Sequence, residues 1–518
     1  MKTYLILLFA FYFINANCQP SISWRKTYGG SSDDDGFSME KTPDGGMIIA
    51  GKTISNNMNV SGNHGAVDIW VVKLNNVGVI EWQKCLGGSL GEIANSVKVT
   101  NDGGYVVCGW TNSNDGDVSG FHGTIYKDSW VVKLNSIGDI EWQKCLGGSL
   151  NDYSNDICQT NDGGYVLIGV TGSNDGDVIG NDGISQDIWI VKLSSSGLLE
   201  WQKTYGGLYP DEGNSIKQTN DGGYIMIGTP GSNDGDVINN HGGTDIWLVK
   251  LNNSGLIEWQ SCLGGSNEEK AYEIQLCTDG GYVISGSTKS TDGDVVGLHS
   301  GFGSTDFWIV KLNSSGTIEW QKCLGGSGIE GARSIEQSFD GGYIVAGESY
   351  SNTGDGDVSC HHGSTNYCDI WLAKLNSVGS TEWETCLGGS KNDYAHSVRS
   401  FSDGSYAIFG GTESSDDDVI GHLGNYDFWL VKMNSEVGLN ESNKQISPIV
   451  SPNPNNGQFA LECEEELIGH SYVITDQQGR EVGHGIIEKN NTILDIYLND
   501  GIYFLKIDQV IIKLDIKK

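Results

Sequence analysis

Proline and clustered basic residues are scarce in this chain. Only 7 of its 518 residues are proline, while 75 are glycine, which excludes a proline-rich disordered chain and favours many tight turns between ordered strands. Lysine and arginine number 31 against 66 aspartates and glutamates, a formal net charge of −35. Binding to nucleic acid or to an anionic membrane surface is therefore not expected. Such an acidic surface suits a secreted protein, a cation-binding protein, or both.

Long apolar runs are absent except at the N-terminus, where Lys2 precedes an apolar run over residues 4–14. This run is too short to span a bilayer and predicts a cleaved secretory signal over residues 1–18. Ala16 and Cys18 would occupy the small-residue cleavage positions. A lipid-anchored Cys18 is the alternative, which Asn17 disfavours. We expect no transmembrane segment elsewhere in the chain.

Familiar catalytic motifs are missing as well. The chain has no Gly-x-Ser-x-Gly elbow, no His-Glu-x-x-His and no phosphate-binding glycine loop. We therefore favour a protein that is not an enzyme. Glycoside hydrolysis stays open, because that mechanism needs only two carboxylates at the right separation.

What the chain does have is a unit that recurs seven times, about 58 to 63 residues apart. Each unit holds a Trp-bearing strand ending in Gly-Gly, a DGG turn and an Asp-x-Trp strand. The first marker falls at Trp24, Trp82, Trp142, Trp201, Trp259, Trp320 and Trp383, and the last at Trp70, Trp130, Trp189, Trp247, Trp308, Trp371 and Trp429.

Each unit predicts four strands, which in the second copy are residues 96–100, 105–110, 128–134 and 140–145. Short Gly-containing turns join the first to the second strand and the third to the fourth. Runs such as residues 130–134 are apolar on both faces, which indicates strands covered on both sides. We expect an all-β fold, a seven-bladed β-propeller of four-stranded blades. A linear β-solenoid is the alternative, but its terminal caps are not found.

The two ends of the array predict how the ring closes. The chain enters with a Trp strand over residues 23–28 that has no companions before it, and the array ends with the strand at residues 427–433, which lacks its Trp partner. We expect these two strands to complete one blade together, which removes the open sheet edge.

After the repeats, the pattern changes. We expect the propeller over residues 19–437, a linker over 438–447 and a small β-sandwich-like domain over 448–518. The last segment contains Ser451-Pro452-Asn453-Pro454, an Asp476-x-x-Gly479 hairpin and the strand Leu498-x-x-Gly501-Ile502-Tyr503. These motifs resemble the type A sorting domain of Bacteroidetes proteins exported by the type IX secretion system. The repeats likewise resemble propeller repeats common in that phylum.

The resemblance implies export to the periplasm and then across the outer membrane, with the secretion machinery as partner of the tail. In such proteins the tail is often removed and the passenger attached to surface lipopolysaccharide. We therefore expect a protein of the outer-membrane surface or the extracellular medium.

Asp-rich loops precede the Asp-x-Trp strands. Carboxylates this close together, with a glycine that allows a sharp bend, are what Ca²⁺ requires, so calcium is the one cofactor considered. The candidate ligands are Asp115, Asp117, Asp175, Asp177, Asp234, Asp236, Asp292, Asp294, Asp355, Asp357, Asp416 and Asp418. The alternative, which we favour, is that these side chains cap their own turns. Blade one has Asn57 and Asn59 instead.

Two further sets of polar residues follow the repeat, and we interpret both as structural. A His follows the Asp-rich loop in five copies, at His64, His122, His241, His299 and His362, and an acid follows Gly-Gly at Glu92, Asp152, Glu212, Glu330 and Asp393.

The twelve cysteines do not predict a disulfide framework. Cys85, Cys145, Cys262, Cys323 and Cys386 occupy one position of five repeats, too far apart to pair with one another, and we expect them to be small buried hydrophobic residues. Cys360 and Cys368, inside one loop, are the candidate disulfide. A Zn²⁺ site formed by these two with His361 and His362 is the alternative.

A single substrate needs residues that break the repeat. Candidates are this loop, Arg333, residues 209–212 and 126–127, and Trp110, whose ring would suit glycan stacking although core packing is favoured. With no catalytic residue identified, we expect a non-catalytic propeller that binds an extracellular glycan or protein. A polysaccharide-degrading enzyme with its site in the propeller mouth and a structural spacer are the alternatives.

Overall fold

The computed structural model describes residues 19–123, 125–181, 185–299 and 303–435, and, of the C-terminal part, 449–451, 458–462, 470–476, 480–487, 489, 491–495, 500–507 and 510–516. The expected signal peptide and linker lie outside these residues. The chain divides into two compact units, Met1–Glu436 and Val437–Lys518. Within the described ranges, no helix has the length and apolarity to cross a membrane.

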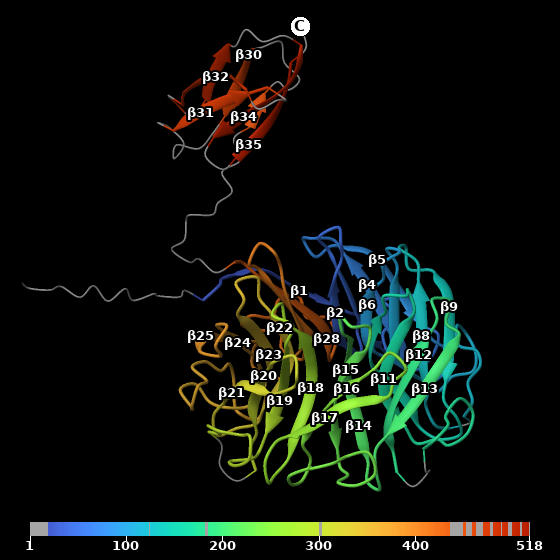
Figure 1. Cartoon of the computed structure of the whole chain (residues 1–518). Helices are drawn as coiled ribbons and strands as arrows, with labels where there is room; N and C mark the ends of the chain where they lie inside the picture. Colours follow the sequence, from blue (N-terminus) through green and yellow to red (C-terminus); the bar gives the residue numbers. More distant parts are fainter. Residues whose placement is uncertain are drawn as a thin grey trace, which may run out of the picture. The chain divides into compact units, whose positions relative to one another are not determined.

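The first unit is a closed ring of seven four-stranded antiparallel sheets (Figure 1). The innermost strands are β2 (Asp34–Lys41), β6 (Glu92–Val99), β10 (Asp152–Gln159), β14 (Asp211–Gln218), β18 (Glu269–Leu276), β22 (Glu330–Gln337) and β26 (Asp393–Ser400). The second strands are β3 (Met47–Thr53), β7 (Tyr105–Thr111), β11 (Tyr165–Thr171), β15 (Tyr224–Pro230), β19 (Tyr282–Thr288), β23 (Tyr343–Ser349) and β27 (Tyr406–Thr412). The third are β4 (Asp68–Leu74), β8 (Asp128–Leu134), β12 (Asp187–Leu193), β16 (Ile246–Leu251), β20 (Asp306–Leu312), β24 (Asp369–Leu375) and β28 (Asp427–Met433). The outermost are β1 (Ile22–Tyr28), β5 (Ile80–Leu86), β9 (Ile140–Leu146), β13 (Leu199–Tyr205), β17 (Ile257–Leu263), β21 (Ile318–Leu324) and β25 (Thr381–Leu387).

Ring closure follows the prediction. β1 pairs antiparallel with β28 and forms the outermost strand of the last blade, in the order β1-β28-β27-β26. The innermost strand of that blade, β26, contacts β2 of the first blade. The N-terminal strand therefore fastens the ring, and no blade of the propeller lacks a strand.

The core lies between blades. One cluster joins Ile49 and Trp70 of the first blade to Phe409 and Phe428 of the last, and the other interfaces repeat the arrangement. All seven Asp-x-Trp tryptophans are fully buried. Because both faces of a sheet pack against a neighbouring sheet, the third strands carry buried apolar residues on both faces, as the sequence pattern predicted.

Six of the seven third strands also bury a lysine, which the sequence pattern did not predict. Lys73 is 3 % exposed, and its Nζ donates to Asp44 of the DGG turn (2.7 Å) and to Glu81 of the outermost strand (2.8 Å). Corresponding ion pairs are made by Lys133, Lys192, Lys250, Lys311 and Lys374. The Asp of DGG is thus the partner of a buried charge as well as a turn residue.

The innermost strands begin earlier than predicted. The first strand of the second blade covers Glu92–Val99, where residues 96–100 were expected. The register with β7 shifts between Ala94 and Ser96, so Asn95 is an extra, bulged residue. A bulge interrupts the apolar alternation and hides the start of the strand from a periodicity reading.

The second unit contains two antiparallel sheets. Their orders are β29-β30-β33 and β32-β31-β34-β35. The strands are β29 (Ile449–Ser451), β30 (Gln458–Glu462), β31 (Ser471–Thr475), β32 (Glu481–Ile486), β33 (Asn491–Asp495), β34 (Gly501–Ile507) and β35 (Val510–Ile516). Ile474, Leu505 and Leu514 of the four-stranded sheet are fully buried.

Candidate functional site

The bulge recurs at the same place in the innermost strand of every blade. The register shift falls there in all seven first strands. It leaves one ring of residues, namely Phe37, Asn95, Asn155, Asn214, Tyr272, Arg333 and His396, along the central channel. Bulges re-aim side chains and are common beside functional sites. We call these seven residues the bulge ring.

The bulge ring has two chemically different halves. In blades two to four it consists of asparagines that bind the neighbouring blade: Asn95 Nδ2 donates to Ser154 O (2.8 Å), and Asn155 Nδ2 donates to Gly213 O (2.9 Å). In blades five to seven and one it consists of Tyr272, Arg333, His396 and Phe37. At this inward-facing position, the second half is therefore where the propeller departs from the asparagine of the other blades.

A cavity of about 410 Å³ opens over the second half of the ring. It is lined by Asp33, Asp35, Phe37, Lys52, Arg333, Tyr394, His396 and Tyr426. Its volume lies within the range of small-molecule binding pockets. We call it the mouth cavity.

Aromatic rings form much of this wall. The centroids of Phe37 and His396 are 5.3 Å apart in an edge-to-face arrangement, and Tyr394 stacks on His396 at 6.4 Å. Burial, followed by the charges of Arg333 and Lys52, lowers the pKa of His396 to about 3. The imidazole is therefore neutral at physiological pH and keeps one donor and one acceptor nitrogen.

Both cations of the mouth cavity already have carboxylate partners. Arg333 donates to both oxygens of Glu348, with Nε–Oε2 at 2.9 Å and Nη2–Oε1 at 2.6 Å, and its guanidinium carbon lies 4.4 Å from the Tyr272 ring centroid. Lys52 Nζ lies 3.6 Å from Asp35 Oδ2. Burial raises the pKa of Asp35 to about 6, although Lys52 partly offsets this.

Asp33 differs from these paired groups. Its Oδ1 atom is buried and has no hydrogen-bond partner within the described part of the chain. A buried acceptor without a donor is costly, so such an atom usually marks a place where a ligand or water donates.

The channel below the bulge ring is closed by ion pairs. Lys217 Nζ donates to Asp156 (2.7 Å), and Lys98 lies between Asp156 (3.9 Å) and Glu40 (3.7 Å). Arg399 continues the network to Glu40 and Glu273 (3.8 Å each). Burial opposes ionisation of Asp156, yet Lys217 and Lys98 outweigh it and hold its pKa below the usual range. Only about 100 Å³ stays open here, so the mouth cavity has a floor.

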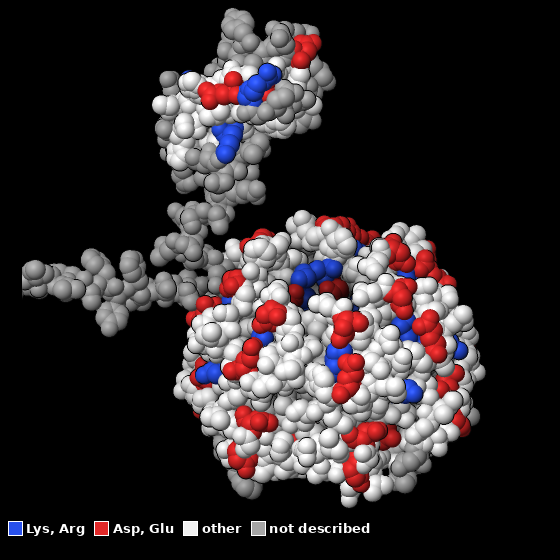
Figure 2. All heavy atoms as spheres, in the orientation of Figure 1, with Lys and Arg blue, Asp and Glu red and all other residues white. Residues whose placement is uncertain are grey.

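Among the described residues, no single cluster of acidic side chains stands out on the face of the propeller that Figure 2 draws. On the propeller face drawn in Figure 2, acidic side chains are spread widely, and the hollow that holds basic side chains also holds acidic ones. Charge of one sign is therefore not gathered over this face.

The Asp-rich loops bind the backbone of the adjoining linker. The first carboxylate of each predicted pair accepts a backbone N–H, as Asp115 does from Ser89 at 2.7 Å, and the corresponding acceptors are Asp175, Asp234, Asp292, Asp355 and Asp416. In blade one the neutral Asn57 accepts from Ser31 N in the same way (2.9 Å). Because an uncharged residue makes the same hydrogen bond, the contact needs no carboxylate charge. It joins the loop to a linker 26 residues earlier, whereas the expected capping lies within the loop's own turn. Calcium binding at these loops stays a prediction.

The second carboxylates face a histidine of the preceding blade. His64 Nε2 lies 3.9 Å from Asp117, and the same pairing joins Asp177, Asp357 and Asp418 to His122, His299 and His362. Asp236 and Asp294 accept from Gly206 N and Gly264 N. The other ring nitrogen of His64 binds the buried Asp68 (2.7 Å). These histidines are therefore placed between blades and lie outside the mouth cavity.

The acidic residue after each Gly-Gly pair accepts hydrogen bonds from the linker between two blades and from the blade that this linker enters. Glu92 accepts from Gly88 N (2.9 Å) and from the Thr111 hydroxyl (2.7 Å). In the fourth blade the equivalent residue is Asp211, which accepts from Gly207 N, so the assignment of Glu212 to this position was wrong by one residue.

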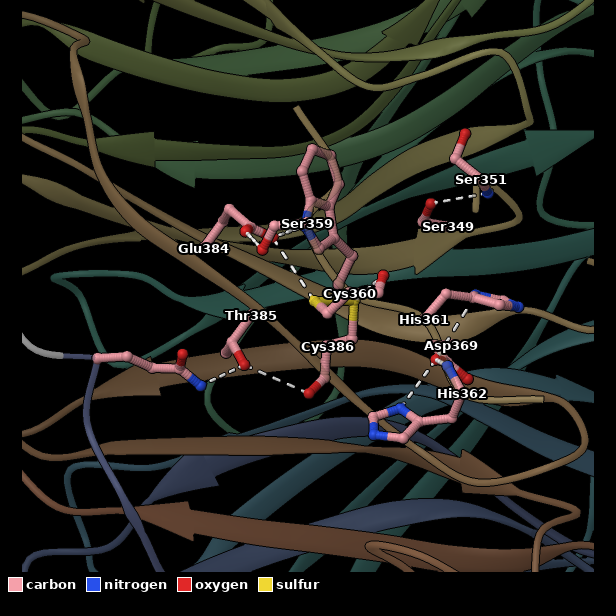
Figure 3. The surroundings of a disulfide bond; sticks show 12 residues. Ser349, Ser351, Ser359, Cys360, His361, His362, Asp369, Glu384, Thr385 and Cys386 are labelled. Carbon is pink, nitrogen blue, oxygen red and sulfur yellow. Dashed lines mark hydrogen bonds and ion pairs between the residues drawn. A yellow bond between two sulfur atoms is a disulfide. The ribbon is translucent and has the colours of Figure 1, made fainter. Parts of the chain in front are cut away.

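The disulfide prediction was wrong in its partner. Cys360 is bonded to Cys386 of β25 (Figure 3), while Cys368 is a buried free thiol. The loop that holds Cys360 packs against β25, the outermost strand of its own blade. In the last blade the equivalent contact joins Gly421 to Thr27, whose hydroxyl donates to Gly421 O. Cys386 occupies the Thr27 position, so the repeat register could have predicted the pair. The other four repeat-position cysteines are buried free thiols, as expected.

The zinc alternative does not fit this geometry. Glu384 is the third member of the one group of metal-ligating atoms among the described residues, with Cys360 and Cys386. Both sulfurs are used by the disulfide. His361 and His362 point toward Asp369 instead (Figure 3).

Of the remaining repeat breaks, Arg333 alone reaches the mouth cavity. Tyr209 is an exposed linker residue. Lys127 Nζ lies 3.8 Å from the Trp110 ring centroid and covers one face of it.

Comparison with known proteins identifies the C-terminal unit. Residues 450–517 match the secretion system C-terminal sorting domain, so the chain is a secreted cargo of the type IX secretion system, delivered to the cell surface or the medium, and its tail engages the secretion machinery. No curated protein matches the chain.

Solved structures similar to the chain include several propellers and a surface protein. Sqt1 from Chaetomium thermophilum is 10 % identical (TM-score 0.38) over 80 % of this chain and 99 % of that one. The WD40 domain of Neurospora crassa Pan2 is 9 % identical (TM-score 0.40) over 78 % and 89 %. PorZ, a surface component of the type IX secretion system of Porphyromonas gingivalis, is 12 % identical (TM-score 0.31) over 94 % and 71 %.

Proposed function

We propose that this protein is a secreted, non-catalytic binding propeller that holds its ligand in the mouth cavity. The observation that carries the proposal is the asymmetry of the bulge ring. The inward-facing bulge position is asparagine in three blades and aromatic or charged in the other four, and three of those four residues, Phe37, Arg333 and His396, border the mouth cavity. Delivery to the cell surface exposes such a cavity to extracellular ligands.

The pairing of the charged groups favours binding over catalysis. Arg333 and Lys52 are held by carboxylates, and Cys368 is a buried free thiol whose pKa is raised by burial. A hydrolytic function is the second candidate, because Asp35 has a pKa of about 6 and shares the cavity with Asp33. General acids of glycosidases are carboxyls with raised pKa values.

The test compares the secreted protein with two variants at equivalent positions. His396→Ala removes a wall of the mouth cavity, whereas Asn214→Ala changes the asparagine half of the bulge ring. We expect extracellular polysaccharide and glycoprotein fractions to be retained by the unaltered protein and by Asn214→Ala, and to be lost with His396→Ala. Equal retention by all three would place binding elsewhere and contradict the proposal. Shortening of the polysaccharide that Asp35→Asn abolishes would favour the hydrolase. If no fraction is retained at all, a structural spacer is the remaining interpretation.

A further inference from the structure

The mouth cavity presents aromatic rings that no cation of the described residues covers. Phe37 and Tyr272 are engaged by the cations Lys52 and Arg333. Tyr394 and Tyr426 also line the wall, and no cation of the described chain lies over their rings. An aromatic face attracts the slightly positive C–H groups of a ligand through its quadrupole. The ligand is therefore expected to have an apolar face about as wide as one ring.

The electrostatics disfavour an anionic ligand. A carboxylate, sulfate or phosphate group would need a cation whose charge is not already balanced by a carboxylate of the protein. Arg333 already gives its Nε and Nη2 hydrogens to Glu348, which is 5 % exposed. Lys52 is balanced by Asp35. No unneutralised positive charge remains among the residues that line the cavity.

A cationic ligand is disfavoured for the converse reason. Aromatic cages that bind ammonium groups leave their rings open to the cation. Lys52 Nζ already occupies that place at Phe37 of the mouth cavity, 5.7 Å from the ring centroid. The Arg333 guanidinium likewise lies 4.4 Å from the centroid of Tyr272, a bulge-ring residue outside the cavity lining. A ligand ammonium would have to displace these side chains to reach the two rings.

Hydrogen bonding supplies the remaining requirement. The unpartnered Oδ1 atom of Asp33 needs a donor, and His396, being neutral, can accept or donate one hydrogen bond more. A ligand that suits these groups carries several hydroxyls along one edge. A neutral pyranose combines that edge with a face of C–H groups.

The floor of the cavity decides which part of a sugar chain can enter. The ion pairs of Asp156, Lys217 and Arg399 close the channel beneath the bulge ring. A polysaccharide cannot pass through, so only the end of a chain can be inserted. We propose that the mouth cavity binds the terminal residue of a neutral glycan, by stacking on Tyr394 and Tyr426 and by hydroxyl donation to Asp33. This rests on the proposed binding function and specifies its ligand.

The experiment uses immobilised glycans and matched tyrosine variants of the secreted protein. The probes are neutral oligosaccharides ending in hexose or N-acetylhexosamine, the same cores capped with sialic acid or sulfate, and a choline-coated surface. Tyr394→Ala is compared with Tyr153→Ala, since Tyr153 occupies the same strand position on β10 and lies outside the cavity. Tyr394→Phe keeps the ring, and Asp33→Asn removes the negative charge of the carboxylate that holds the unpartnered acceptor.

We expect binding to neutral termini and loss of it when the terminus is capped. Tyr394→Ala should weaken binding at least about tenfold, because it removes a stacking face, while Tyr153→Ala and Tyr394→Phe should stay within about twofold of the unaltered protein. Asp33→Asn should also weaken binding. Should Tyr394→Ala fail to fold, Tyr426→Ala tests the same stacking.

Two results would contradict the inference and still agree with the proposed binding function. One is capture of the sulfated or sialylated probes through the mouth cavity, and the other is capture of choline. Neutral glycan binding that Tyr394→Ala and Asp33→Asn leave unchanged overturns it as well. Binding of no probe, together with no retention of any extracellular fraction, would overturn both.

Discussion

Arg25 stands beside the indole of Trp429 where six other blades place a hydrogen-bond acceptor. In those blades the buried tryptophan donates its Nε1 hydrogen to a Gln or Glu of the outermost strand, as Trp70 does to Gln83 (2.8 Å). Trp429 Nε1 has no partner in the described structure, because Arg25 occupies the position and donates instead to Asp418 (2.6 Å). The blade that closes the ring is thus the one whose Asp-x-Trp indole has no hydrogen-bond partner among the described residues.

Replacing Arg25 with glutamine should stabilise the propeller. An unsatisfied buried N–H costs about 1–3 kcal/mol, whereas the ion pair lost with Asp418 is partly exposed and worth about 0–1 kcal/mol. We expect a net gain of about 1 kcal/mol, or a rise in Tm of about 1 °C for a unit of this size, measured by calorimetry. The matched variant Gln83→Arg should lower Tm, because it creates the same defect at Trp70. A lower Tm for Arg25→Gln would contradict the account.

Buried carboxyls should make the protein less stable as pH rises. Burial raises the pKa of Asp393 to about 7, although hydrogen bonds from Thr412, Gly389 and Ser414 oppose the shift. A carboxyl that holds its proton more tightly in the folded state contributes stability that is complete below pH 4 and is lost as pH rises through 7. We expect Tm to fall from pH 5 to pH 8.

The variant Asp393→Asn should flatten this profile, whatever its effect on absolute stability. Asp139→Asn is the control, since Asp139 is exposed and its pKa, lowered by Lys84, lies below the interval. The interpretation fails if both variants keep the slope of the unaltered protein.

The ring fold could be predicted from the sequence because its cause is local and repeated. Each Asp-x-Trp strand is apolar on both faces, and residues 23–28 lack companions. The mouth cavity could not be predicted in the same way. The bulge at Asn95 and at the equivalent positions determines which residues of the innermost strands face the channel. A bulge shifts the strand register without leaving an apolar pattern in the sequence. Arg333 was noticed as a break in the repeat, but only the fold brings it to His396 and Phe37.

Removing the disulfide should destabilise the sixth blade. Cys360 and Cys386 are 26 residues apart, and a cross-link over such a loop is worth about 3 kcal/mol, or about 3–4 °C in Tm. We expect this loss in Cys386→Ser and, for the unaltered protein, on adding a reductant. Cys368→Ser, which changes a buried free thiol, should differ little from the unaltered protein. A peptide map without reductant should join the peptides containing Cys360 and Cys386; a link from Cys360 to Cys368 would contradict the assignment.

Calcium removal tests the predicted function of the Asp-rich loops. The Oδ1 atoms of Asp115 and Asp416 accept backbone hydrogens (2.7 and 2.8 Å), and Asn57 shows that a neutral side chain suffices. A metal bound to the folded state alone would raise Tm by mass action, so a chelator would lower it by several degrees. We expect instead a change below about 1 °C with chelator or with added Ca²⁺. Asp115→Asn, which copies the first blade, should keep the Tm of the unaltered protein. A large fall on chelation, absent from a variant with all six first-position aspartates changed to asparagine, would establish the loops as calcium sites.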